Sequence, residues 1–171
     1  MFLVLCGQFA AYTYVTPFLA QVSGFDGKAI SSILLGYTAI GLLGNFLGGA
    51  GAGRNVKTTF LLTIVFVLPP LLLLPALGHD KAWAVALLAV WGLAYGAMPV
   101  ALQVWMAKAA TDVPEGGMAL FVGNFQISIA LGSLAGGLLI DLHGLGGALY
   151  FGAGMALASA LLLAVLGRKP D

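Results

Sequence analysis

Six long apolar stretches follow one another along the chain, separated by short groups of charged residues. They cover approximately residues 1–23, 29–52, 58–77, 82–107, 116–140 and 146–167. Each is close to the roughly 20 apolar residues that a helix needs to cross a bilayer, and none carries a charged side chain near its middle. The pattern therefore predicts a single domain, residues 1–171, of six transmembrane helices with short connections.

These stretches are continuously apolar, which distinguishes them from the strands of a membrane barrel. A barrel strand alternates apolar and polar residues over about ten positions, whereas these segments are much longer and do not alternate. The first stretch is also too long for a signal peptide, and no basic residues precede it. We therefore expect an all-α membrane protein.

Composition excludes several other classes of protein. Of the 171 residues, 61% are hydrophobic and 8% are charged, compared with about 25% charged in an average soluble domain. The mean hydropathy is +1.05. A soluble enzyme and a disordered chain are excluded, and the single cysteine, Cys6, excludes an intrachain disulfide. A net charge of +1 gives no indication of nucleic-acid binding.

The distribution of Lys and Arg predicts the orientation. With a cytoplasmic amino terminus, five basic residues lie inside and two lie outside. The five are Arg54, Lys57, Lys108, Arg168 and Lys169, and the two are Lys28 and Lys81. Because cytoplasmic loops are enriched in Lys and Arg, we expect both termini in the cytoplasm.

Two glycine-rich segments, Leu43–Gly49 and Leu131–Gly137, match at a constant offset of 88 residues. Each contains a GxxxG pair, which lets helix backbones approach closely. The residues expected at such contacts are Gly44, Gly48, Gly49, Gly132, Gly136 and Gly137. The match is either chance or the sign of two three-helix units. Span two enters from outside and span five from inside, so such units would be inverted repeats, a known plan of transporters.

Four segments together point to a known family. They are Gly7-Gln8-Phe9-Ala10-Ala11-Tyr12-Thr13-Tyr14-Val15-Thr16-Pro17-Phe18, Gly44-Asn45 with Gly48-Gly49, Trp91-Gly92 with Gln103, and Gly136-Gly137 with Asp141. In order and spacing they resemble the second half, helices seven to twelve, of a major facilitator superfamily transporter, in the bacterial drug and sugar efflux branch of proton antiporters. The resemblance covers essentially the whole chain. It implies a protein of the bacterial inner membrane that needs no cofactor and exports a small organic solute by alternating access, coupled to protons in the complete protein.

The loop motif of this family, Gly-x-Leu-Ala-Asp-Arg-x-Gly-Arg, falls on residues 49–57, which read Gly-Ala-Gly-Ala-Gly-Arg-Asn-Val-Lys. Gly49, Ala52 and Arg54 match the motif, whereas Gly53 replaces its acidic residue and Lys57 its final arginine. This departure argues against a charge relay through the loop. We expect Arg54 to act as a positive anchor on the cytoplasmic side.

Members of the family have twelve spans, twice the number expected here. The chain is therefore either a fragment of a longer protein or a half-sized protein that pairs with a second copy. In both cases the expected partner is a second six-helix half. The chain also has no carboxylate or basic side chain deep in any span, so a proton-coupling carboxylate is expected in the other half.

The resemblance implies that the first and fourth spans line the central cavity. Gln8 and Tyr12 are four residues apart and share a helix face, and Tyr95 and Met98 form a similar stripe. The candidates for the substrate-binding wall are Gln8, Tyr12, Thr13, Thr16, Tyr95, Met98, Gln103 and Asn124. Together they predict a neutral, partly aromatic surface for an uncharged or weakly amphipathic solute.

Other roles remain open for several of these residues. A buried amide needs water or a partner, so Gln8 and Gln103 fit either a wet cavity or a helix contact. Thr13 and Thr16 can bond their own helix backbone. Interhelical hydrogen bonds are the alternative for Asn45, Asn124 and Tyr37, whereas Trp83 and Trp105 have the positions of interface anchors. The prolines at 17, 69, 70, 75 and 99 are expected to kink or break their helices.

Catalytic and metal-binding patterns are absent from the sequence. His79 and His143 lie in separate predicted loops without metal-ligand spacing, and no GxSxG or HExxH motif occurs. The sequence thus predicts a transporter half and no enzyme. The alternative is a non-transporting membrane subunit, or an inactive fragment, that packs against a partner through its glycine-rich faces.

Overall fold

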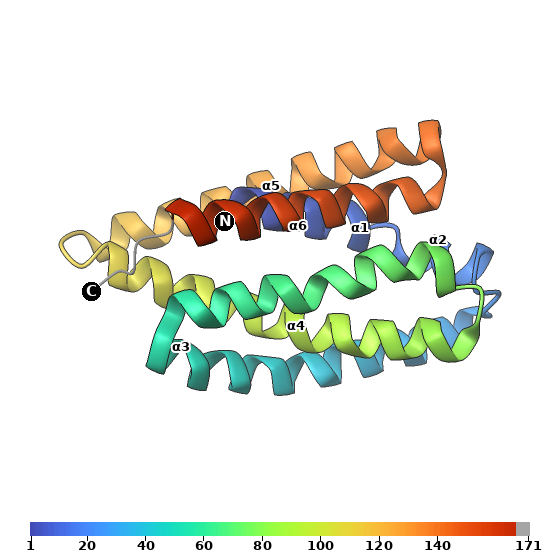
Figure 1. Cartoon of the computed structure of the whole chain (residues 1–171), viewed down its shortest axis with the longest axis horizontal. Coiled ribbons are helices and arrows are strands. Elements are labelled where there is room, and N and C mark those ends of the chain that lie inside the picture. The colour runs from blue at the N-terminus through green and yellow to red at the C-terminus, as the bar shows by residue number, and fades with distance from the viewer. Residues whose placement is uncertain (167–171) are drawn as a thin grey trace.

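The computed structural model describes residues 1–166 and consists of helices, without a strand in that part of the chain. The helices are α1 (Phe2–Tyr12), α2 (Val15–Gln21), α3 (Gly27–Leu77), α4 (Lys81–Ala109), α5 (Pro114–His143) and α6 (Leu145–Leu166). They lie roughly parallel to one long axis (Figure 1). The residues Arg168 and Lys169, which entered the orientation argument, and the predicted end of the last span at Gly167 lie outside the described part.

Within residues 1–166, five helical segments are long and apolar enough to cross a membrane. They are Phe2–Gln21, Gly27–Leu77, Lys81–Ala109, Pro114–His143 and Leu145–Val165. This confirms the expected all-helical architecture of apolar segments. One of the five, α3, has 51 residues, so it would be about 75 Å long if straight. It is instead two arms that run back alongside each other (Figure 1).

The reversal in α3 occurs at Asn55, whose φ of −152° and ψ of 96° are not helical. Its side chain accepts a hydrogen bond of 3.1 Å from the backbone N–H of Thr58, as a helix N-cap does. Gly51 makes room for the reversal, because a Cβ atom there would lie 2.7 Å from Oγ1 of Thr59. The sequence predicted a loop over residues 53–57, whereas the structure breaks the helix at one residue.

A second break separates α1 from α2 and follows from Pro17. Proline has no N–H, so the carbonyl of Thr13 has no donor four residues later. Tyr14 leaves the helical region, with φ −110° and ψ 12°. Its hydroxyl donates to the backbone oxygen of Ser133 in α5 at 2.9 Å, and the hydroxyls of Thr13 and Ser133 are 2.8 Å apart. The break is thereby fastened to α5.

The remaining prolines do not interrupt their helices. The helix α4 is continuous through Pro99, and the second arm of α3 is continuous through Pro69, Pro70 and Pro75. Of the prolines expected to kink or break a helix, only Pro17 lies at a break.

The helices pack in two groups that meet where α3 contacts α6 and α4 contacts α5. In Figure 1, α1, α5 and α6 form one group, and the two arms of α3 pack along α4 in the other. The second arm of α3 also contacts α6, which joins the groups. Side chains from both groups form one core. Its largest fully buried members include Leu5, Leu19, Ile64, Leu71, Leu88 and Trp91.

Glycines stand where backbones approach most closely. A Cβ atom on Gly48 would lie 2.7 Å from Cα of Ala97 in α4, and one on Gly44 would overlap the Leu93 carbonyl. In α5, Gly132 meets the Cys6 carbonyl of α1 in the same way.

The next glycine of α5, Gly136, lies against the Ala10 backbone of α1. Gly49 has only an ordinary contact with Val100, and Gly137 lies under the Tyr14 hydroxyl. The spacing of four residues therefore brings one face of each GxxxG pair onto a neighbouring helix.

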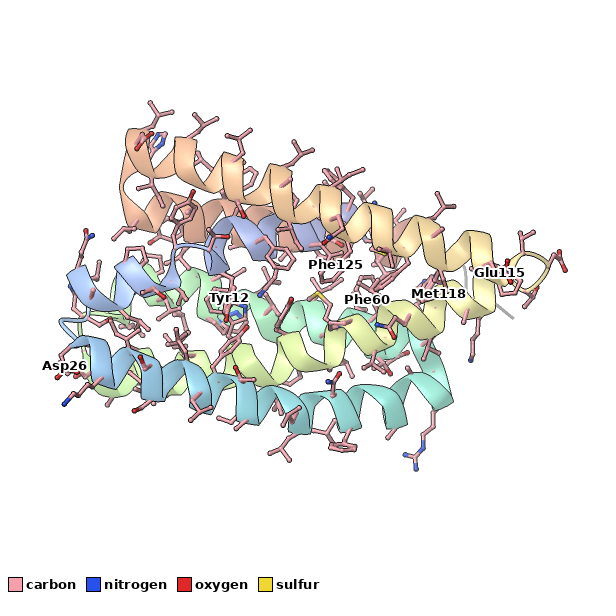
Figure 2. The ribbon with its side chains drawn as sticks, turned by 180° about the vertical axis from the view of Figure 1, so that it is seen from behind. Tyr12, Asp26, Phe60, Glu115, Met118 and Phe125 are labelled. Atoms are coloured by element: carbon pink, nitrogen blue, oxygen red, sulfur yellow. The ribbon has the colours of Figure 1, made fainter. Side chains whose placement is uncertain are left out.

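Different interhelical connections lie at the two ends of the bundle. Figure 2 shows Asp26 at one end and Glu115 at the other. At the Asp26 end, that carboxylate accepts from the Ala29 N–H at 2.7 Å, and Asp80 caps α4 in the same manner. Gly144, with a φ of 73°, separates α5 from α6, a conformation that favours glycine.

Candidate functional site

A groove of about 500 Å³ runs between α1, the first arm of α3 and α4. Its polar and aromatic lining residues are Tyr12, Tyr37, Thr38, Asn45, Tyr95 and Gln103. None of the lining residues is charged, in the part of the chain that the structure describes. A second groove of about 360 Å³, between α4 and the arms of α3, is lined almost entirely by apolar side chains and glycines. The first groove is therefore the candidate site.

Close backbone contacts place the wall of this groove. A Cβ atom on Gly92 would lie 2.6 Å from the carbonyl oxygen of Tyr37, and one on Gly96 would overlap the carbonyl of Gly41. The first arm of α3 can thus lie directly against α4. This approach brings the ring of Tyr37 next to Trp91, with ring centroids 6.2 Å apart and planes nearly perpendicular.

Tyr12 of α1 is the centre of an aromatic cluster. Its ring stacks on Tyr37 at 5.3 Å and on Tyr95 at 6.3 Å, and it meets the edge of Trp91 at 6.1 Å. Figure 2 shows Tyr12 in the interior of the bundle, between its two groups of helices. Pairs at these distances stabilise by about 0.5–1.5 kcal/mol beyond burial, so the wall is a fixed surface of tyrosine rings.

Gln8 lies behind this wall and is 1% exposed. Its Oε1 accepts a hydrogen bond of 2.8 Å from the indole N–H of Trp91. In the part of the chain that the structure describes, neither Gln8 Nε2 nor Tyr37 Oη has a hydrogen-bond partner.

The chain is similar to proteins that are named as efflux transporters. No family model matches it, and no solved structure does so significantly. It is 30% identical over 145 residues to a protein named "probable sugar efflux transporter" from Helicobacter acinonychis, over 84% of this chain and 37% of the relative. It is 29% identical over 164 residues to the purine ribonucleoside efflux pump NepI of Salmonella typhimurium, over 96% of this chain and 41% of the relative.

These relatives are efflux transporters. A further relative, named transcription regulatory protein OpdE, from Pseudomonas aeruginosa, is 38% identical over 173 residues, over 98% of this chain and 42% of the relative. The chain spans about two fifths of the length of the curated relatives it matches. The expectation that the chain resembles transporters and not enzymes is confirmed by these efflux relatives.

The predicted site residues divide between this groove and other places. Tyr12, Tyr95 and Gln103 line it, and Gln8 lies behind it. Met98 is 0% exposed and is absent from the lining, so its side chain belongs to the core. Tyr37, for which the sequence left both a cavity and a helix contact open, lines the groove together with Asn45.

The other candidates lie away from the groove. Thr13 bonds Ser133, and Thr16 is exposed on α2. Asn124 lies on α5, with an Oδ1 that has no partner among the described residues. Trp83 is 53% exposed at the start of α4, whereas Trp105 packs on Phe60 at 6.2 Å. The groove is thus lined by only part of the predicted substrate-binding set, together with Tyr37, which was not in that set.

Proposed function

We propose that the chain forms one six-span half of a major facilitator-type efflux transporter, which exports a small neutral solute carrying a planar or sugar-like ring. The observation that carries this proposal is the uncharged groove lined by Tyr12, Tyr37 and Tyr95 in a chain similar to efflux transporters. The arms of α3 on either side of Asn55 would count as separate spans, which gives six in all.

Reciprocal glycine contacts support two inverted three-helix repeats in this half. In the first unit, Gly44 and Gly48 lie against Leu93 and Ala97 of α4. In the second, the glycines 88 positions later lie against residues 6 and 10 of α1, which are 87 positions before 93 and 97. The second helix of each unit therefore packs against the first helix of the other unit. A twofold relation between the units requires this arrangement.

The open side of the groove supports a second half as the partner. Asn45 and Gln103 are exposed polar side chains on mostly apolar helices. Polar groups facing hydrocarbon are unfavourable, so a facing unit that encloses them with water is expected. That unit is either the rest of a longer protein or a second copy of this chain.

The chemistry of the wall and the names of the relatives favour ring-bearing solutes. One relative is named for purine ribonucleosides and another for sugars. Tyrosines offer flat apolar faces, and the hydroxyls and the two amides offer hydrogen-bonding groups. Among the described residues, no cation lines the groove to bind an anionic group. We propose that nucleosides or neutral sugars are exported and that sugar phosphates are not.

Alternating access would move the solute outward, with the cytoplasm at the Arg54 and Lys108 end of the bundle. No Asp, Glu, Lys, Arg or His stands deep in a span, so proton coupling would depend on a carboxylate in the other half. The test is counterflow of labelled nucleosides and sugars in vesicles that contain the assembled protein. Transport abolished by Tyr12→Ala supports the proposal, and an assembled protein that moves neither class of solute contradicts it.

A further inference from the structure

Two neighbouring helices each present a tyrosine to the groove and, eight residues later, an amide. The pairs are Tyr37 with Asn45 on the first arm of α3 and Tyr95 with Gln103 on α4. We propose that the groove binds a glycoside with a planar aglycone, whose ring lies against the tyrosines while its sugar hydroxyls bond the two amides. This inference rests on the proposed function of the groove as the binding site of the exported solute.

The two helices carry these pairs in the same direction. In Figure 1, the first arm of α3 and α4 begin at the same end of the bundle. The backbone contacts between them rise in step, from Tyr37 with Gly92 to Gly41 with Gly96. Eight helical residues span about 12 Å, so each amide lies about that distance beyond its tyrosine, toward the Asn55 reversal. The groove therefore has an aromatic end and an amide end.

The ring surface at the aromatic end is supplied by Tyr12 and Tyr95. Both side chains are partly exposed, and their rings stack at 6.3 Å. Tyr37, which is 5% exposed, packs on the Tyr12 ring at 5.3 Å and holds it in place. Aromatic rings pack well against other planar rings, offset-stacked or edge to face. A planar aglycone thus finds a preformed apolar surface at this end.

The free hydrogen-bonding groups at the other end are the amides of Asn45 and Gln103. Both side chains are exposed, and within residues 1–166 neither is hydrogen-bonded. Thr38 also lines the groove, but its hydroxyl already donates to the Leu34 carbonyl at 3.0 Å. An amide offers two donor hydrogens and a carbonyl acceptor, and a hydroxyl both donates and accepts. The two amides therefore suit the adjacent hydroxyls of a sugar.

The second glycine-rich segment shows what a contact between helices would use in place of a solute. Ser133 lies 88 residues after Asn45, and its hydroxyl is 2.8 Å from that of Thr13 in α1. The residue of α4 that lies 87 positions after Thr13 is Val100, and its Cγ1 would be 3.7 Å from a Cβ atom on Gly49. Valine has no polar group for an amide. The polar side chain is used between helices at Ser133, whereas at Asn45 it remains for the solute.

A solute that contacts both ends needs two different parts. A free planar base has a ring for the tyrosines but no sugar hydroxyls for the amides, and a free sugar has the reverse. When the two parts are joined, the second contact is made by a molecule that the first already holds. The groove should therefore bind the glycoside more tightly than either part.

The experiment is equilibrium binding to the purified full chain in detergent. The probes are adenosine, its 2′-deoxy and 3′-deoxy analogues, adenine and ribose. A hydroxyl that bonds an amide predicts about fivefold weaker binding of the analogue that lacks it. Adenine and ribose should each bind more weakly than adenosine. The variants Asn45→Leu and Gln103→Met remove an amide at similar size, and the double variant should bind adenosine and both deoxy analogues equally.

Gln126 provides the matched control. It is an exposed amide on the mostly apolar α5 and is not among the residues that line the groove. Gln126→Met makes the same chemical change as Gln103→Met and should leave the hydroxyl preference intact.

Several results would overturn the inference. They are equal binding of adenosine and both deoxy analogues by the unmodified chain, adenine binding as tight as that of adenosine, a hydroxyl preference that survives in the double variant, and no binding of any probe. The first two comparisons need no variant and so do not depend on the folding of one. Nucleoside transport by the assembled protein without a hydroxyl preference contradicts this inference alone. Hydroxyl-dependent binding without transport contradicts only the proposed function.

Discussion

Substitution of Gly48 by alanine tests whether helix packing depends on the glycine faces. A Cβ atom at this position would lie 2.7 Å from both Cα and O of Ala97, well inside the 3.5–4.0 Å of a favourable contact. The obstructing atoms belong to a helix backbone and cannot turn aside as a flexible side chain would. The arm of α3 must therefore move away from α4.

The magnitude follows from two opposing terms. Overpacking by one methyl group typically costs about 1–3 kcal/mol, whereas alanine in place of glycine favours a helix by about 0.5–1 kcal/mol. The net effect expected for Gly48→Ala is a loss of roughly 1–2 kcal/mol in the free energy of unfolding. For a chain of this size such a loss lowers Tm by about 2–8 °C.

Gly36 offers the matched control in the same arm of α3. A Cβ atom there would meet nothing within 4 Å, so only the helix-favouring term applies and Gly36→Ala should leave Tm unchanged or raise it. Thermal unfolding in detergent can be followed with a thiol-reactive dye, because the one cysteine, Cys6, is buried. A Tm for Gly48→Ala equal to that of Gly36→Ala would refute the reasoning.

Three further predictions concern topology, binding and coupling. In a Cys6→Ala background, a membrane-impermeant thiol reagent should label Gly53→Cys only from the cytoplasm and His79→Cys only from the periplasm, and the reverse pattern would contradict the orientation. Tyr95→Ala should weaken solute binding about fivefold or more through lost ring contacts, with Trp83→Ala, at an exposed residue outside the groove, leaving affinity unchanged in the same titration. The purified chain alone should give at most facilitated diffusion in vesicles, and uphill transport driven by a proton gradient would show that a coupling group is present within it.

The boundaries of the apolar segments were predictable because membrane thickness fixes their length. The charged groups at residues 26–28 and 79–81 lie at helix ends in the structure, where Asp26 and Asp80 act as caps. The reversal at Asn55 was less predictable. An apolar helix on each side of a short polar group fits both a loop and a one-residue break. The two are distinguished by the cap that Asn55 forms on Thr58 and by the contact of Gly51 with Thr59, which appear only in the structure.

The assignment of faces was the harder part of the site. In a membrane helix both the core and the lipid favour apolar side chains, so periodicity carries little information about which side faces inward. Met98 was expected in the wall and lies in the core, whereas Tyr37 lies in the wall. The sequence spacing of Tyr95 and Met98 predicts that they share a helix face. The close approach of α3 to α4 at Gly92 and Gly96 decides which of the two side chains lines the groove.

The break between α1 and α2 has a mechanical consequence. Because Thr13 and Tyr14 are both fastened to Ser133, the joint between the two short rods has a fixed pivot on α5. On the α1 side of the break, Gln8 and Tyr12 are held against Trp91. On the α2 side, Phe18 and Leu19 are buried in the core. Each rod is therefore held by contacts of its own, and the break lets the two differ in direction while both remain attached to α5.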